Sequence, residues 1–388
     1  MKEKNLFIPY SKPSISEEEI KKVIEVMKSG WLTSGPKVIQ FENDFKTFIS
    51  KENNLEAISV NSATSGLHLA LEACGIGGGD EIITTSLTFT ATAEVARYLG
   101  AEVKFIDIEP NSMNIDVKQI RKKITKNTKA IIAVHYAGLS CEMDEIFKIA
   151  KEFDLKVIED AAHALPSSYL GSLIGSLRSD ATVFSFYANK NITTGEGGMV
   201  VTRSEDMAKR MRLMRLHGMD RDAYDRFTSQ KGSWYYEIIA PGFKYNLTDL
   251  SAAIGIEQLK KLPMLHEKRK KLANKYFDEL KDLPIILPSD APAKECHSWH
   301  LFVIRLKKDL KITRDELIKK MNKDGIGTSV HYVPLHLQPY WKNRYELDTK
   351  DFKETNKAYN SMVSIPLYPD LSEEDQERVI MSLQKNLG

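Results

Sequence analysis

The sequence predicts an α/β protein with a mostly parallel central sheet flanked by helices, and two observations support this prediction. Between residue 57 and about residue 205, short runs rich in β-branched and apolar residues alternate with segments of helical periodicity. Several of these runs are apolar on both faces, as is typical of parallel strands covered by helices on each side. In such a sheet, ligands bind near the carboxyl ends of the strands.

The first helix precedes this alternation. Ser16 and Glu19 have the spacing of a capping box, and Gly30 can end the helix. One apolar stripe recurs between them at helical spacing: Ile20, Val23, Ile24 and Met27. Predicted strands then follow at residues 57–60, 81–84, 103–107, 130–135, 156–159 and 181–186, with a helix at residues 63–73 after the first strand.

The pattern changes beyond Asn246, where a smaller C-terminal α+β domain is expected. The elements predicted there are helices at residues 247–261, 265–280, 314–323 and 372–386 and a strand at residues 299–306. Pro263 is expected to interrupt the chain between the first two of these helices. We therefore predict a large domain over residues 1–250 and a small domain over residues 251–388, packed closely because no low-complexity linker separates them.

Composition excludes several classes of protein. The 388 residues are 42% apolar and 28% charged, and 55 basic against 53 acidic side chains leave a net charge of only +2. Such a balance gives no general attraction to nucleic acid or to membranes. No apolar run approaches the roughly 20 residues that span a bilayer, and three widely spaced cysteines fit neither a disulfide framework nor a zinc site. We expect a cytoplasmic protein without a metal.

One lysine carries most of the chemical information. Lys190 lies in a short polar loop between two apolar, strand-like runs within residues 181–201. Enclosure by packed strands would desolvate its ammonium and lower the pKa towards the neutral amine. A neutral amine is what Schiff-base chemistry with pyridoxal phosphate requires. An exposed loop lysine is the ordinary alternative, and Lys190 taken alone would favour it.

A phosphate-binding segment is predicted after the first strand. Residues 61–66, Asn-Ser-Ala-Thr-Ser-Gly, place small hydroxyl side chains at a helix N-terminus, where free N–H groups and the positive end of the helix dipole favour an anion. Thr64 and Ser65 are the candidates in this segment. Ser185, at the end of another strand, is a further candidate donor to the phosphate. An ordinary N-cap and a serine bonded to backbone are the alternatives.

An acid and a ring follow other strand ends. Asp160 comes at the carboxyl end of an apolar strand, where it could pair with the ring nitrogen of pyridoxal phosphate. His163 is close enough in sequence to reach the same pocket, and Phe89 could stack on the cofactor ring. A helix cap, a core histidine and a core phenylalanine are the respective alternatives. Together with the lysine and the phosphate segment, these residues predict a pyridoxal phosphate site.

The residues stand in motifs that resemble the DegT/DnrJ/StrS family of pyridoxal phosphate-dependent nucleotide-sugar aminotransferases. The segments NSATSGLHLAL, KAIIAVHYAG, VIEDAAHA, SFYANKNITTGEGGMV and GFKYNLTDLSAAIG occur in the family's order, and the resemblance extends from Gly30 to Tyr332. It implies fold type I and a homodimer with active sites at the interface. It also implies amino transfer from L-glutamate to a nucleotide-linked keto-sugar, expected to be a UDP- or dTDP-4-keto-sugar, for cell-surface glycans such as lipopolysaccharide.

The resemblance also implies a role for each candidate residue. Lys190 would hold the cofactor covalently and move the proton, Asp160 would pair with the pyridinium nitrogen, and His163 would approach the phenolic oxygen. Phe89 would stack on the ring. The phosphate would be held by Thr64, Ser65 and Ser185, together with Asn246 from the neighbouring subunit. The sugar nucleotide would be contacted by His331, Arg221 and Arg226.

Some segments are most similar to enzymes that aminate a UDP-4-keto-pentose for lipid A modification, namely residues 222–226, 242–249 and 297–302. Phe89 in place of tryptophan, and the segment 332–336, differ from that subgroup. A minority of the family carries histidine at the lysine position and catalyses dehydration, so Lys190 favours transamination.

Two alternatives stay open from the sequence. The acceptor could be a keto-cyclitol or another cyclic ketone without a nucleotide. The chain could also be a non-catalytic relative that binds the cofactor or a sugar nucleotide as a sensor, although Lys190 and Asp160 count against this alternative.

Overall fold

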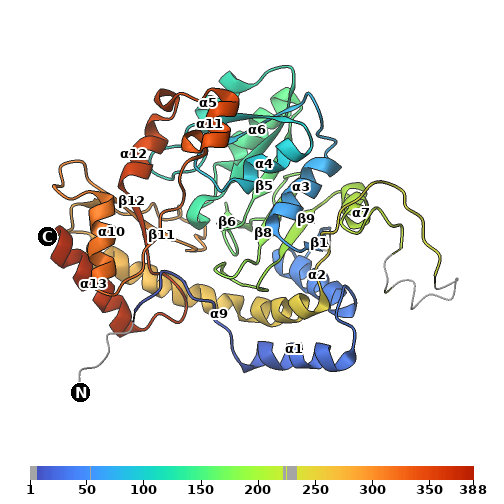
Figure 1. Ribbon diagram of the computed structural model, residues 1–388, viewed down its shortest axis with the longest axis horizontal. Helices are drawn as coiled ribbons and strands as arrows, with labels where there is room; N and C mark the ends of the chain where they lie inside the picture. The colour runs from blue at the N-terminus through green and yellow to red at the C-terminus, as the bar shows by residue number, and fades with distance from the viewer. Residues whose placement is uncertain (1–6, 53, 222–223, 225–233) are drawn as a thin grey trace.

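The structure is a computed structural model that describes residues 7–52, 54–221, 224 and 234–388. Its centre is a seven-stranded sheet with helices on both faces (Figure 1). The strands, in spatial order, are β1 (Glu56–Val60), β9 (Gly198–Thr202), β8 (Ala181–Ser185), β5 (Lys156–Asp160), β4 (Thr128–Val134), β2 (Glu81–Thr85) and β3 (Glu102–Ile106).

The sheet is mostly parallel, as predicted. Strands β8, β5, β4, β2 and β3 pair in parallel, whereas β9 is antiparallel to both of its neighbours, β8 and β1. Strand β1 therefore runs in the same direction as the other five, and six carboxyl ends meet at one edge of the sheet. Each strand predicted in this region is present, within about two residues at either end.

Alternation along the strands explains the two helical layers. Ile132 and Val200 face a core that includes α3 (Ala63–Ala73), α4 (Ala91–Tyr98) and α7 (Glu205–Met214), whereas their neighbours Ile131 and Val201 face the other side. That other side is covered by α2 (Pro36–Ile49), α5 (Val117–Lys123), α6 (Met143–Phe153) and the first half of α9 (Asp249–Leu280). Both faces are apolar because both are covered.

A second core surrounds a three-stranded sheet of β10 (Ile285–Ile286), β11 (Phe302–Leu306) and β12 (Met362–Ile365). Helices α10 (Arg314–Lys323) and α13 (Glu373–Leu387) cover it, which confirms the smaller α+β domain. The described chain also contains the short elements β6 (Ser168–Tyr169), β7 (Ser172–Leu173), α11 (Pro339–Tyr345) and α12 (Lys353–Ser361). The boundary at residues 250 and 251 stays a prediction, and Leu335, Trp341 and Phe352 join the core of the large sheet.

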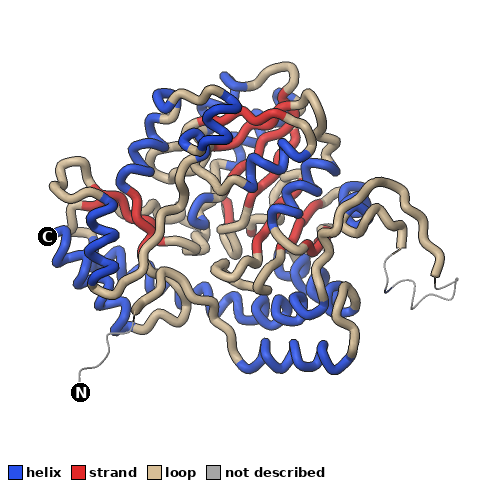
Figure 2. The backbone as a smooth tube through the Cα atoms, viewed as in Figure 1, coloured by secondary structure: helices blue, strands red, loops and turns tan. Residues whose placement is uncertain are grey.

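The predicted break at Pro263 is wrong. One helix, α9 (Asp249–Leu280), continues through this proline and lies beneath both sheets (Figures 1 and 2). Proline removes one backbone hydrogen bond, but buried side chains on either side hold the helix in place. Leu262 and Leu265 belong to the core of the large sheet and Tyr276 to that of the small sheet. Tertiary packing therefore outweighs the local preference.

Helix α1 (Glu17–Ser29) is confirmed with its capping box, and Gly30 ends it at a φ of 75°. It packs against α9 through Glu19 and Val26. The predicted apolar stripe, however, does not face the core of this chain: Ile20, Ile24 and Met27 are 46%, 44% and 61% exposed. None of the helices in the described ranges is both long and apolar enough to cross a membrane.

Gly255→Ala should destabilise the protein, because α9 lies directly against the buried Phe41 ring. A Cβ at Gly255 would lie 2.6 Å from Cζ of Phe41, closer than carbon atoms approach. Overpacking of this kind costs about 1–3 kcal/mol, so the thermal midpoint should fall by several degrees. Gly77→Ala is the matched control, because no atom lies within 4 Å of its added Cβ. Equal midpoints for the two variants would contradict the packing described here.

Candidate active site

A cavity of about 400 Å³ opens at the carboxyl edge of the large sheet. Strands β1, β2, β4, β5 and β8 all deliver residues to it, and one side is closed by His300, just before β11, and by His331 and Tyr332, between α10 and α11. The polar and aromatic residues of its lining are Ser62, Thr64, Thr88, Phe89, Asp160, His163, Ser185, Tyr187, Asn189, Lys190, Glu196, His300, His331 and Tyr332. The predicted residues Thr64, Phe89, Asp160, His163, Ser185, Lys190 and His331 are all among them.

The N-terminus of α3 forms one end of the cavity. Ser62 caps this helix, because its Oγ accepts from the Ser65 backbone N–H at 3.1 Å. Ser62 and Thr64 line the cavity, but the structure does not bring Ser65 there. The Ser65 hydroxyl is buried and donates to Asn61 Oδ1 at 2.5 Å, so its proton is used within the cap. Ser62 does line the cavity, although in the folded chain its own proton is donated to Ser65 Oγ at 2.9 Å.

Asp160 leaves the end of β5 as a buried carboxylate. Its Oδ2 accepts from Thr92 Oγ1 at 2.7 Å, and its Oδ1 accepts from the Ala162 N–H at 3.1 Å. Because the single Thr92 proton points to Asp160, the Thr88 hydroxyl must donate in its 2.7 Å contact with Thr92. This chain of donors fixes the orientation of the carboxyl group.

Lys190 lies in the loop between β8 and β9, where its N–H donates to the carbonyl of Tyr187 at 3.0 Å. Withdrawal from water lowers the pKa of Lys190 to about 8, while the nearby Asp160 carboxylate acts in the opposite direction. A lysine tuned in this way supplies a useful fraction of neutral amine near neutral pH.

The histidines beside Lys190 are held neutral. His163 Nδ1 accepts from the Ala137 N–H at 3.2 Å, so Nε2 carries the proton and donates to Tyr332 Oη at 2.9 Å. Burial and the Lys190 charge lower the pKa of His163 well below its ordinary value. The same causes lower the pKa of His331 to about 4. Lys190 is therefore the group in this cluster that binds a proton near neutral pH.

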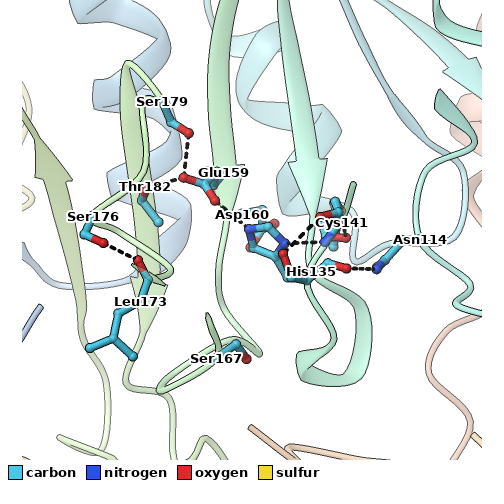
Figure 3. A network of polar contacts seen from close by, with 12 residues as sticks. Asn114, His135, Cys141, Glu159, Asp160, Ser167, Leu173, Ser176, Ser179 and Thr182 are labelled. Atoms are coloured by element: carbon cyan, nitrogen blue, oxygen red, sulfur yellow. Dashed lines mark hydrogen bonds and ion pairs between the residues drawn. The ribbon is translucent and has the colours of Figure 1, made fainter. Parts of the chain in front are cut away.

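A second polar network stands behind the site, on the opposite face of β5 (Figure 3). His135 Nε2 lies 2.8 Å from Glu159 Oε2, and both side chains are fully buried. Ser179 and Thr182 donate to the other carboxylate oxygen at 2.5 and 2.8 Å. His135 Nδ1 accepts from the Cys141 N–H at 3.1 Å, so Nε2 carries the proton and donates to the Glu159 carboxylate. This pair ties the end of β4 to β5 next to the point where Asp160 emerges.

Two more predicted residues in the described part of the chain, Asn246 and Arg221, are not brought to the cavity of their own chain. Asn246 donates to Ser34 Oγ at 2.7 Å and accepts from Lys244, away from the cavity. Arg221 donates to the carbonyl of Tyr235 at 3.3 Å, in a segment that projects from the body beside α7 (Figure 1). Arg226 lies outside the described residues.

Other lining residues were not predicted. Tyr332 bonds His163 and lies with its ring centroid 5.8 Å from that of Phe89, which is 56% exposed. Its position next to His331 in the sequence was the available signal. His300 lies in the motif HSWHLF, but nothing in the sequence indicated which of its two histidines would face the cavity.

The residues present fit pyridoxal phosphate. An amine of lowered pKa, a buried carboxylate and an uncovered ring surround one cavity, and a helix N-terminus with hydroxyl side chains provides the donors that a phosphate needs. This fold and this donor set define a pyridoxal phosphate-dependent aminotransferase. The chain belongs to the DegT/DnrJ/EryC1/StrS aminotransferase family, whose sequence model matches residues 13–384.

Individual relatives agree with this assignment. MJ1066 of Methanocaldococcus jannaschii is 47% identical over 98% of this chain and 97% of its own length. The spore coat polysaccharide biosynthesis protein SpsC of Bacillus subtilis is 42% identical, covering 99% and 98%. The putative sugar aminotransferase Spr1654 of Streptococcus pneumoniae, solved in its PMP form, superimposes with a TM-score of 0.90 at 32% identity, covering 97% and 98%. The resemblance, the fold and the cofactor are thereby confirmed, and the chain is an enzyme rather than a sensor.

In the cofactor-free protein, Lys190 should react with formaldehyde and cyanoborohydride at lower pH than a solvated lysine does. Its rate should rise to a midpoint near pH 8 rather than near the ordinary value of 10.5. Asp160→Asn should shift that midpoint to lower pH, because the Asp160 carboxylate raises the Lys190 pKa. Peptide mass spectrometry over a pH series measures both rates. A midpoint near 10.5, or an upward shift in the variant, would refute this electrostatic account.

Proposed function

We propose that this aminotransferase moves the amino group of L-glutamate to a nucleotide-linked keto-sugar, with a UDP- or dTDP-4-keto-sugar as acceptor, in the synthesis of a cell-surface polysaccharide. The observation that carries the proposal is Lys190, tuned by burial and placed at the sheet edge beside Asp160. The names of SpsC and Spr1654, a spore coat polysaccharide biosynthesis protein and a putative sugar aminotransferase, support a sugar as the acceptor.

Each group in the cavity has a chemical task. When bound, pyridoxal phosphate supplies the carbonyl that exchanges the amine and the ring that accepts electrons. The N-terminus of α3, with Ser62 and Thr64, would hold the phosphate, and Asp160 would face the ring nitrogen. Lys190 would take a proton from the substrate carbon at Nζ and return it on the other side of the exchange, which one amine of intermediate pKa can do.

The neutral histidines make this proton transfer specific. A protonated imidazole beside Lys190 would repel its ammonium and would compete as a proton donor. His163 instead uses both ring nitrogens in hydrogen bonds with Ala137 and Tyr332. It would hold its ring against the cofactor oxygen without exchanging a proton in turnover.

We propose that the site is shared between two copies of the chain. Among the described residues that line the cavity, Lys190 is the one cation, yet glutamate and a sugar diphosphate bring several negative charges. A neighbouring copy would supply Asn246 to the phosphate and Arg221 and Arg226 to the sugar nucleotide. Exposed apolar groups support such an interface, including Trp234 and Ile239, 76% and 57% exposed, and the outer stripe of α1.

Addition of L-glutamate to the protein loaded with pyridoxal phosphate should replace the cofactor's absorption band with that of its amino form. Lys190→Ala should lower the rate of this conversion by about 10²–10⁴-fold, the contribution of a positioned general acid and base. Lys156→Ala is the control, because Lys156 pairs with Asp180 at the far end of β5. Turnover of Lys190→Ala at the wild-type rate would exclude the mechanism.

Mixing two inactive variants tests the shared site. Lys190→Ala and Asn246→Ala should each lose most activity as separate proteins. After mixing and reassembly, a mixed dimer would contain one site with both native residues, so part of the activity should return in a steady-state assay. If Asn246 served the cavity of its own chain, every site in the mixed dimer would lack one residue and no activity would return.

A further inference from the structure

His300 lines the cavity and is only 5% exposed, yet it takes no part in the proton transfer proposed for Lys190. Its partner is Asn191, the residue directly after Lys190. The Asn191 side chain is buried, and its Nδ2 donates to the backbone carbonyls of Leu165 at 2.8 Å and Ser298 at 2.9 Å. An amide nitrogen only donates and a carbonyl only accepts, so these two contacts fix the orientation of the amide.

The fixed amide in turn decides the tautomer of His300. Asn191 Oδ1 faces His300 Nδ1 at 3.0 Å, and this oxygen can only accept, so Nδ1 carries the hydrogen. In a neutral imidazole the other nitrogen, Nε2, then holds a lone pair. The ring edge with Nε2 lies opposite Asn191, and no described residue donates to it. The cavity therefore contains a hydrogen-bond acceptor, His300 Nε2, for which the described residues supply no donor.

The surroundings keep His300 neutral and indicate what it can bind. Its ring centroid lies 4.4 Å from that of His163, and burial together with His163 and Lys190 lowers the pKa of His300 well below its ordinary value. Neutral imidazole nitrogens accept from O–H donors but repel carboxylate oxygens, which have no hydrogen to give. A sugar ring carries several hydroxyl donors, whereas the two carboxylates of glutamate only accept and its single donor group, the α-ammonium, is the group that reacts.

We propose that His300 Nε2 accepts a hydrogen bond from the sugar hydroxyl next to the carbon that receives the amine, so that the enzyme prefers acceptors that keep this hydroxyl over their deoxy counterparts. The inference rests on the proposed function, because it concerns the sugar half of that reaction. Asn191 acts through His300 and is a positioning residue.

The tautomer is tested first, without cofactor or turnover. Two-bond ¹⁵N–¹H spectra of the histidine-labelled, cofactor-free protein should show one ring with a protonated Nδ1 and a bare Nε2, absent from His300→Gln. Finding His300 with its hydrogen on Nε2 would overturn the inference, because the cavity would then present a donor.

Two variants then separate the two nitrogens. His300→Asn places an amide where Nδ1 lies and removes the acceptor at the cavity, whereas His300→Gln places an amide where Nε2 lies. The probes are dTDP-4-keto-6-deoxyglucose and its 3-deoxy analogue, with the UDP esters in parallel. Loss of one neutral hydrogen bond should raise the KM of His300→Asn for the hydroxylated acceptor about 5–10-fold, with little change in kcat. His300→Gln should recover most of this loss.

The deoxy analogue distinguishes a lost contact from a damaged site. Wild type should favour the hydroxylated acceptor about 5–10-fold, and His300→Asn should show almost no preference. An equal rise in KM for both acceptors, or a loss of the same size in the glutamate half-reaction, would overturn the role of His300 and leave the proposed function standing. A wild-type enzyme that converts with glutamate but aminates no nucleotide keto-sugar would overturn both.

Discussion

Close approach of backbone at Gly198 is the constraint on which the site depends. Gly198 pairs with Ser185 at the end of the β8–β9 ladder, so this pair anchors both ends of the Lys190 loop at the carboxyl edge of the sheet. A Cβ at Gly198 would lie 2.8 Å from the Ala63 nitrogen and 2.9 Å from the Phe184 carbonyl oxygen. The missing side chain lets the N-terminus of α3 and the lysine strand approach each other, which brings the phosphate donors and the amine into one cavity.

The protonation states of the groups in the cavity depend on their enclosure by the protein. Removal of solvent lowers the proton affinity of the amine and of the imidazoles in the cavity, but not equally. Asp160 partly compensates Lys190, whereas His163 and His300 are committed through their hydrogen-bond partners to neutral tautomers. The cluster therefore holds a single mobile proton, on the residue that the chemistry uses. Behind β5, the buried Glu159 carboxylate is fully hydrogen-bonded by His135, Ser179 and Thr182.

Short sequence patterns predicted which residues stand at the ends of strands, and several of these residues line the cavity. Asp160 and Ser185 end apolar strands, and Thr64 follows one, so a sheet that aligns its carboxyl ends had to bring them together. Ser65 could not be placed from sequence, because one residue along a helix turns the side chain by about 100°, from the cavity into the cap. The helix break predicted at Pro263 is absent because α9 is stabilised by packing against residues far away in the chain. His300 depends on Asn191, more than 100 positions earlier, and a contact of that kind leaves no periodic signal.

The continuous helix α9 has a further consequence for how the chain loses its structure. Its first half completes the core of the large sheet and its second half completes that of the small one. If either core unfolded, α9 would lose about half of its packing contacts, and the other core would then be covered by a less stable helix. Because both cores depend on the same helix, neither can unfold without destabilising the other. The chain should therefore unfold in one cooperative transition, although a chain of this length with two cores could unfold in two.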